Sequence, residues 1–212
     1  MDINQIRLKD KKYCLVADLD IFDDEDEFLN AIASGLKVGF QMIQLKAKNS
    51  VAGRMVEVGK KIRNLCSMYG AVFVVNDRAD VAKIVEADGV HLDQYGIAVH
   101  CAREILDSNA IVGLSVSSYE QVVKAQQDRV DYIVLESIFS VSVESKTNDF
   151  ISEITNLTAN NSGIPFYIMF ENNSVDISSV IGSVIPRIAL NLPMLKNRNI
   201  EDYLSDILNK LK

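Results

Sequence analysis

The sequence has little of the material that marks several specialised classes of protein. Among its 212 residues are no tryptophan, three prolines and ten glycines, while 48% of the residues are hydrophobic. These proportions exclude a collagen-like or disordered chain and indicate an ordinary globular protein. A chain of this length hides roughly 70% of the surface that it exposes when unfolded, which is enough for one large core. We therefore expect a single domain over residues 1–212.

Cysteine and long apolar runs are also scarce. Cys14, Cys66 and Cys101 are widely spaced and include no C-x-x-C pair, which favours neither a disulfide framework nor a zinc site and is typical of a reducing compartment. The amino end, MDINQIRLKDKK, has no apolar core, and no run approaches the roughly 18 apolar residues of a membrane span. We expect neither a signal peptide nor a membrane span, and we predict a cytoplasmic location.

The sequence has fewer positively charged than negatively charged residues. The 22 lysines and arginines face 29 aspartates and glutamates, so the formal net charge is -7. The electrostatic field of a protein with this negative net charge repels polyanions, so we expect neither nucleic acid nor an anionic membrane as a partner. Any site for a small phosphorylated substrate must then be a local cluster of cations. The oligomeric state stays open, although the apolar stretch at residues 192–195 would allow an interface between copies.

Short β-branched runs alternate with longer stretches of helical period along the chain. Runs such as YCLVA and AVFVV are apolar at nearly every position, as expected for parallel strands covered on both faces. No Gly-rich dinucleotide turn follows the first strand, so we predict an α/β fold, a single (β/α)₈ TIM barrel, rather than a doubly wound sheet. The predicted strands are residues 13–17, 42–46, 72–75, 89–92, 111–115, 132–135, 165–170 and 187–190. The predicted helices are residues 25–37, 51–69, 79–86, 97–106, 120–128, 150–160, 175–183 and 200–212.

Barrel active sites lie at the carboxyl ends of the strands, so polar residues there are informative. Gln44, Lys46 and Lys48 end the second predicted strand at a spacing of two, and we expect them to project from the same side. Two ammonium groups at the barrel mouth suit an anionic, phosphorylated ligand. The alternative is a solvated strand end with ordinary surface lysines.

The third predicted strand runs directly into Asn76 and Asp77. A buried strand that ends in polar residues indicates a functional site. Asp77 can ligate Mg²⁺, and Asn76 can bond a phosphoryl oxygen or a ring substituent. The alternative is that Asp77 caps the helix that begins near Ala79, and both roles are compatible.

These segments resemble the thiamine phosphate synthase family, with its thiazole tautomerase relatives, over about residues 13–195. The matching segments are YCLVAD, QLKAK, VVNDRADVA, ADGVHL followed by Gln94, AREIL, VGLSV and DYIVLESIF. The resemblance implies a (β/α)₈ barrel that acts in thiamine biosynthesis. It also implies a transferase that joins hydroxymethylpyrimidine pyrophosphate to thiazole phosphate with Mg²⁺ and releases pyrophosphate.

The resemblance further implies individual roles. The residues implied to bind the pyrimidine pyrophosphate are Gln44, Lys46, Lys48, Asn76 and Ser115. Asp77 is implied to bind Mg²⁺, and Lys146 to match the lysine of the mobile sixth loop.

The chain departs from the family pattern at several places. Gly96 stands where the family has its second metal carboxylate, and Asp93 is the alternative ligand. The sixth loop is longer than in the family and lacks its threonines. Residues 170–173 are FENN in place of glycines whose amides hold the thiazole phosphate, and residues 191–193 are NLP in place of a small-residue loop. The thiazole half of the site is therefore altered, whereas the pyrimidine half is close to intact.

Three interpretations follow. The chain is a working, divergent synthase, or a non-catalytic barrel that binds a phosphorylated pyrimidine or another small phosphate ester, or a thiazole tautomerase-like enzyme. In the last case Glu136, at the end of the sixth strand, is a candidate acid or base. The alternative for Glu136 is that it neutralises a nearby lysine. His91 matches a G-V-H segment and is expected to anchor a loop by hydrogen bonding rather than to act as a base.

Overall fold

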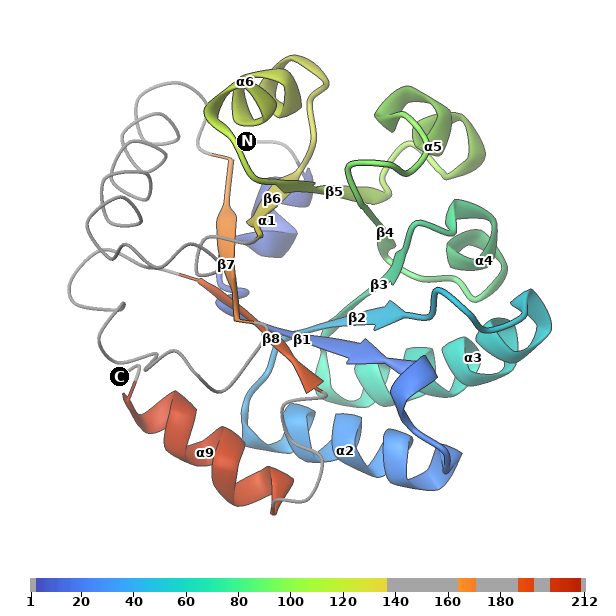
Figure 1. The fold of residues 1–212 in the computed structure, drawn as a ribbon, viewed down its shortest axis with the longest axis vertical. Helices are drawn as coiled ribbons and strands as arrows, with labels where there is room; N and C mark the ends of the chain where they lie inside the picture. The colour runs from blue at the N-terminus through green and yellow to red at the C-terminus, as the bar shows by residue number, and fades with distance from the viewer. Residues whose placement is uncertain (1–2, 137–163, 171–186, 193–198, 211–212) are drawn as a thin grey trace.

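The computed structural model describes residues 3–136, 164–170, 187–192 and 199–210. Eight parallel strands pair in the order of the sequence, and the last pairs with the first to close a barrel (Figure 1). The predicted (β/α)₈ barrel is confirmed. The strands are β1 Tyr13–Asp18, β2 Met42–Lys46, β3 Val72–Asn76, β4 Gly89–Leu92, β5 Ile111–Val116, β6 Tyr132–Leu135, β7 Phe166–Phe170 and β8 Ile188–Asn191.

Helices surround the barrel, as Figure 1 shows. They are α1 Ile3–Leu8, α2 Glu25–Val38, α3 Ala52–Tyr69, α4 Ala79–Ile84, α5 Val99–Ile105, α6 Tyr119–Gln127 and α9 Ile200–Lys210, and a 3₁₀ turn, η1 Leu19–Ile21, follows β1. The helices predicted over residues 150–160 and 175–183 lie outside the described residues. Within the described part of the chain, no helix combines the length and the apolar character needed to cross a bilayer.

The strands are buried on both faces. Alternate residues, such as Met42 and Val74, meet in a cluster with Tyr132 and Tyr167. The intervening strand residues, such as Ile43, pack in a second cluster with the apolar faces of the helices. This arrangement explains why the strand sequences lack a polar alternation.

A short helix closes the amino-terminal end of the barrel, and our sequence analysis did not predict it. Leu8 of α1 is fully buried in the same cluster as Met42 and Tyr132. The side-chain amide of Asn4 donates to the carbonyl of Ala110 at 3.2 Å and to Asp131 at 3.1 Å. These contacts attach α1 to segments that precede β5 and β6.

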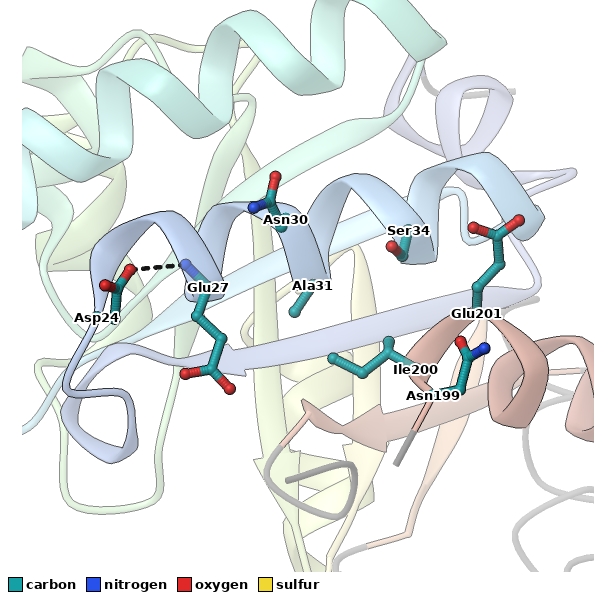
Figure 2. A pocket seen from close by; sticks show the side chains of 8 residues that line it. All are labelled: Asp24, Glu27, Asn30, Ala31, Ser34, Asn199, Ile200 and Glu201. Carbon is teal, nitrogen blue, oxygen red and sulfur yellow. Dashed lines mark hydrogen bonds between the residues drawn. The ribbon is translucent and has the colours of Figure 1, made fainter. Parts of the chain in front are cut away.

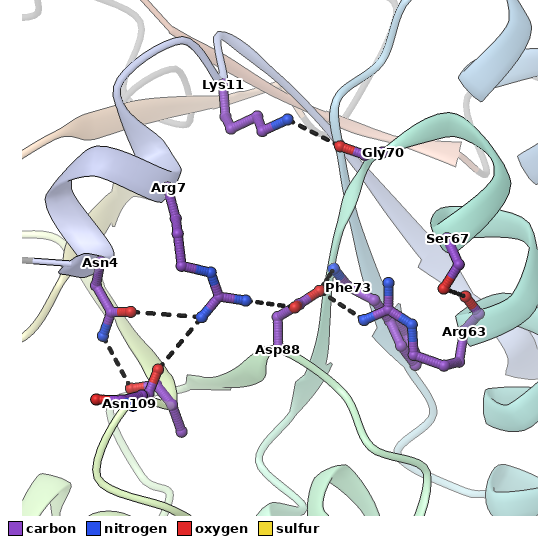
Figure 3. Close-up of polar contacts among 10 residues, drawn as sticks. Asn4, Arg7, Lys11, Arg63, Ser67, Gly70, Phe73, Asp88 and Asn109 are labelled. Carbon is purple, nitrogen blue, oxygen red and sulfur yellow. Dashed lines mark hydrogen bonds and ion pairs between the residues drawn. The ribbon is translucent and has the colours of Figure 1, made fainter.

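Asp88 connects this end of the barrel to the outer helices (Figure 3). Its carboxylate accepts hydrogen bonds from Arg7 of α1, from Arg63 of α3 at 2.7 Å and from the backbone N–H of Phe73 at 2.7 Å. A carboxylate with three donors, two of them arginines, is held firmly. The network is remote from the carboxyl ends of the strands and serves the fold.

The acidic run at residues 22–28 forms a loop and the first turn of α2. Asp24 is the N-cap residue, and its side chain accepts from the backbone N–H of Glu27 at 2.9 Å (Figure 2). A cavity of about 620 Å³ lies there against α9, and its lining includes Asp24, Glu27 and Glu201. Because these carboxylates repel anions, this cavity does not suit a phosphorylated substrate.

Candidate active site

Gln44 and Asn76 lie side by side inside the carboxyl end of the barrel. Both are buried, and the Gln44 side-chain nitrogen donates to the Asn76 side-chain oxygen at 2.5 Å. The Asn76 amide nitrogen donates in turn to Asp77 at 2.8 Å. The Oε1 atom of Gln44, however, has no donor among the described residues. The site therefore contains a buried acceptor that a ligand can satisfy.

Asp77 faces the barrel mouth and does not cap α4. Its backbone is left-handed, with φ of 57°, and its Oδ1 accepts from the backbone N–H of Asp93 at 2.8 Å. The N-cap residue of α4 is Arg78, which makes no side-chain capping bond. The alternative that Asp77 caps this helix is therefore wrong. Burial, together with the charge of Asp93, raises the pKa of Asp77.

The two lysines of the QLKAK segment occupy different positions. Lys46 is the last residue of β2 and pairs in register with Asp18 of β1. Lys48 lies in the loop after the strand, so the expected strand spacing does not extend to it. Its Nζ nevertheless lies 2.9 Å from Oδ2 of Asp93. The hydrogen bond and charge of Asp93 raise the pKa of Lys48.

A hydrogen-bonded chain runs from the mouth into the barrel. The hydroxyl of Ser115 donates to Glu136 at 2.6 Å, and the same oxygen lies 2.9 Å from Nε2 of His91. On the other side, Nδ1 of His91 lies 3.0 Å from the hydroxyl of Tyr132. Because Ser115 has a single proton, which it gives to Glu136, Nε2 must donate to Ser115 and Nδ1 must accept from Tyr132. Burial lowers the pKa of His91 to about 4, which keeps the ring neutral.

These hydrogen bonds show the surroundings of His91 and Glu136, for which the sequence left alternative roles open. His91 is fully buried and both of its ring nitrogens are engaged, so its role is structural, as expected, but its partners Ser115 and Tyr132 belong to strands and not to a loop. Glu136 accepts from Ser115, and its charge also contributes to the raised pKa of Lys48, which supports the alternative that it neutralises a nearby lysine. Gly113 makes this packing possible, because a Cβ atom there would lie 2.1 Å from the Tyr132 ring.

The mouth also offers oxygen ligands for a metal ion. Ligand atoms of His91, Asp93 and Glu136 all lie within 4.8 Å of one another. The His91 nitrogens are already used in hydrogen bonds, so the carboxylates remain, with Asp77 beside Asp93. Carboxylate oxygens are the ligands that Mg²⁺ prefers, and the donor set fits that ion. A Cβ atom on Gly96 would lie 2.7 Å from Oδ1 of Asp77, so position 96 borders the same group.

A cavity of about 360 Å³ opens above these groups. Its lining includes Lys48, Asn76, Asp77, Asp93 and Gly96. The structure thus brings Lys48, Asn76, Asp77 and Asp93 together around one cavity, whereas Gln44, Lys46 and Ser115 are not part of its lining. Lys146 and residues 171–173 lie outside the described residues, and their roles stay predictions.

Two further carboxylates lie at the same rim and were not predicted from the sequence. Asp18 ends β1 beside Lys46, and burial raises its pKa. Asp20, in η1, accepts from the backbone of Asn49 at 2.6 Å and from the hydroxyl of Ser50 at 2.6 Å. The polar end of the YCLVAD strand was a usable signal for Asp18. Nothing local indicated Asp20, because its partners belong to another loop.

The sequence profile described as thiamine monophosphate synthase matches residues 13–191. A thiamine-phosphate synthase of Clostridium perfringens is 30% identical over 201 residues, which are 95% of this chain and 96% of that protein. Synthases of Nostoc punctiforme and Prochlorococcus marinus are 30% and 31% identical, over 88% and 97% of this chain.

The relatives differ in length. The chain spans about half of the Nostoc and Prochlorococcus proteins, 54% and 58% respectively. In fold, it is similar to a thiamine phosphate pyrophosphorylase from Pyrococcus furiosus, with a TM-score of 0.79, 24% identity and 97% of both chains covered. The profile match covers most of the sequence and includes every described strand. The chain belongs to the thiamine monophosphate synthase family.

Proposed function

We propose that this chain is a thiamine phosphate synthase, which joins hydroxymethylpyrimidine pyrophosphate to thiazole phosphate and releases pyrophosphate. Family membership and the grouping of lysines, amides and carboxylates at the barrel mouth support the proposal. The observation that carries it is Gln44, which is 2% exposed and whose Oε1 has no donor among the described residues. A buried acceptor without a partner costs about 1–3 kcal/mol. A pyrimidine ring with an amino substituent supplies the missing donor.

The pyrophosphate is proposed to bind beside the ring, against Lys46 and Lys48. Lys46 pairs in register with Asp18 of the neighbouring strand, and Lys48 forms an ion pair with Asp93. Ammonium groups attract the negative charge that develops on a departing pyrophosphate. The amide of Asn76 and the hydroxyl of Ser115 are proposed to add hydrogen bonds, for which Ser115 turns from Glu136 toward the ligand.

Asp77 and Asp93 are proposed to hold Mg²⁺. When bound, the ion supplies further stabilisation of negative charge on the leaving group. Repulsion between the two carboxylates, which contributes to the raised pKa of Asp77, favours a cation between them.

The proposed reaction needs no nucleophile from the protein. Departure of pyrophosphate leaves a pyrimidine cation that is stabilised by resonance, and the thiazole nitrogen then forms the new bond. The barrel contributes positioning of the two reactants and exclusion of water. Lys146 is proposed to bind the leaving group.

Purified protein mixed with both substrates and Mg²⁺ tests the proposal by formation of thiamine phosphate. Lys46→Ala combined with Lys48→Ala should abolish both product and binding of the pyrimidine pyrophosphate. The matched control is Lys9→Ala combined with Lys60→Ala, which removes the same charge from exposed lysines away from the mouth. Unchanged affinity in the first double variant would contradict the placement of the site.

Two other results would favour the alternatives. Binding of the pyrimidine pyrophosphate without any product favours the non-catalytic barrel. Isomerisation of a thiazole substrate that depends on Glu136 favours a tautomerase-like activity.

We also propose that residues 1–212 form one domain and that the chain acts in the cytoplasm. The support for the cytoplasmic location is that Cys14, Cys66 and Cys101 form no disulfide, and two of them are buried. Unpaired thiols suit a reducing compartment.

A further inference from the structure

The loop that carries Lys48 has an unusual support. Residues 47–51 connect β2 to α3, and Val51 occupies the N-cap position of α3 without a side-chain capping bond. Helices normally begin at a residue whose side chain accepts from the first backbone N–H groups. Because α3 lacks such a cap, the position of this loop must be fixed from elsewhere.

Asp20 provides that support from the neighbouring strand end. One carboxylate oxygen accepts from the backbone N–H of Asn49 at 2.6 Å, and the other accepts from the hydroxyl of Ser50 at 2.6 Å. The backbone N–H of Asp20 donates to Asp18 at 3.1 Å. Asp20 therefore ties the two residues that follow Lys48 to the end of β1.

The charge state of Asp20 suits this role. Although burial opposes ionisation, hydrogen bonds from Ser50 and from the backbone of Asn49 and Lys48 lower the pKa of Asp20, with help from the charge of Arg54. An ionised carboxylate makes stronger hydrogen bonds than a neutral group does. The support is thus present at neutral pH.

Lys48 needs such a support because its own contact is weak. The Lys48 side chain is 59% exposed where it meets Asp93, which is 20% exposed. Ion pairs near solvent contribute about 0–1 kcal/mol, whereas a lysine has about 2 kcal/mol of rotamer entropy to lose. The ion pair alone does not hold the ammonium at the mouth. A fixed backbone reduces the number of positions that the side chain can reach.

We propose that Asp20 is a positioning residue of the pyrophosphate site, which fixes the turn at Asn49 and Ser50 so that Lys48 points across the barrel mouth. The inference rests on the proposed function of Lys48. Asp20 carries the same sign of charge as the ligand, so it acts through Lys48 and not by touching pyrophosphate.

Asp20→Asn and Ser50→Ala test the proposal, with Asp26→Asn as control because Asp26 is an exposed carboxylate of α2. Calorimetry measures the affinity for inorganic pyrophosphate with Mg²⁺ in two backgrounds, the parent and Lys48→Ala. In the parent background, both test variants should weaken binding about fivefold to tenfold, the effect of about 1 kcal/mol. In the Lys48→Ala background the same changes should have less than about a twofold effect, since coupled residues do not add.

Amide hydrogen exchange at Asn49 gives a second readout, which needs no ligand. Exchange should accelerate in Asp20→Asn and stay at the parent rate in Asp26→Asn. Equal pyrophosphate affinity in Asp20→Asn and Asp26→Asn overturns the positioning role, as does an equal loss in both backgrounds, which indicates a general structural effect. A parent protein that does not bind pyrophosphate overturns the proposed function itself. Ser50→Ala keeps the test decisive if Asp20→Asn fails to fold.

Discussion

Lys48 and Asp93 meet across the mouth of the barrel, with 2.9 Å between Nζ and Oδ2. The pair joins the loop after β2 to the end of β4, although β3 lies between these strands. Asp93 raises the pKa of Lys48, and Lys48 lowers that of Asp93 against the opposing effect of burial. Each residue therefore neutralises the other, and binding of an anion or a metal ion here must change this pairing.

Asp93→Asn should change pyrophosphate affinity in opposite directions with and without Mg²⁺. Without the ion, affinity should rise about threefold to tenfold, because Lys48 loses its internal partner and the ligand meets one negative charge fewer. With Mg²⁺, affinity should fall, since one oxygen ligand of the ion is lost. Calorimetry in both buffers measures the two effects. Asp107→Asn, an exposed carboxylate outside the mouth, is the control, and a change of the same sign in both buffers contradicts the shared role.

Much of the fold could be predicted from the sequence. Each described strand begins and ends within one residue of its prediction, because an apolar run with polar flanks marks a buried parallel strand clearly. Gln44 and Asn76 were predicted because residues at the carboxyl ends of barrel strands share one rim, whereas Ser115 was implied only by the family resemblance. All three are buried at that rim.

Other features depend on contacts that no local pattern contains. The helix α1 is short, and Ile3 and Ile6 are exposed, so it shows no clear apolar stripe. It is held by distant partners such as Asp88. The capping role considered for Asp77 was wrong because its backbone N–H bonds the carbonyl of His91 at 2.8 Å, which turns the residue toward β4.

Gly96→Asp should increase the response of the protein to Mg²⁺. A Cβ atom there would lie 2.7 Å from Oδ1 of Asp77, which is closer than van der Waals contact, so the Asp77 side chain must shift to admit an aspartate beside it. Without the ion, added repulsion should lower the melting temperature by a few degrees, the scale of about 1 kcal/mol. With Mg²⁺, the added ligand should tighten binding about tenfold and raise the melting temperature more than in the parent.

Gly96→Asn provides the matched control for that experiment. It adds nearly the same volume without the charge, so it should lack the enhanced Mg²⁺ response. If both variants respond alike, size and not coordination explains the change, and the carboxylate cluster is not the metal site.

Gln44→Met should separate ligand binding from stability. The change removes one hydrogen bond to Asn76 and also the buried Oε1 atom that has no donor. These effects partly cancel, so the free energy of unfolding should fall by only about 1 kcal/mol. Binding of the pyrimidine pyrophosphate should weaken at least about tenfold, because the ring loses its partner. Urea unfolding and calorimetry measure the two quantities.

Val74→Ala is the control for Gln44→Met with the opposite expected pattern, a loss of stability without a loss of binding. Val74 is fully buried in the barrel interior, and its truncation should lower stability by about 2 kcal/mol while ligand affinity stays near that of the parent. A large loss of stability with intact binding in Gln44→Met would show that Gln44 serves the fold alone.

His91 should make the protein less stable as the pH falls from about 6.5 to about 4. Burial lowers the pKa of the folded state from 6.5 to about 4, with smaller effects of Asp93 and Lys46. Below pH 6.5 the unfolded chain therefore binds a proton that the folded chain does not, so the free energy of unfolding falls, by up to about 3 kcal/mol at pH 4. Urea midpoints across this range measure the slope.

His91→Gln removes the titrating group and should flatten the slope, even if it lowers stability at every pH. His100→Gln, at an exposed position of α5, should leave the slope as it is in the parent. An equal slope in the parent and in His91→Gln would mean that the ring is protonated inside the barrel, and the proton order inferred for Tyr132, His91 and Ser115 would then be incorrect.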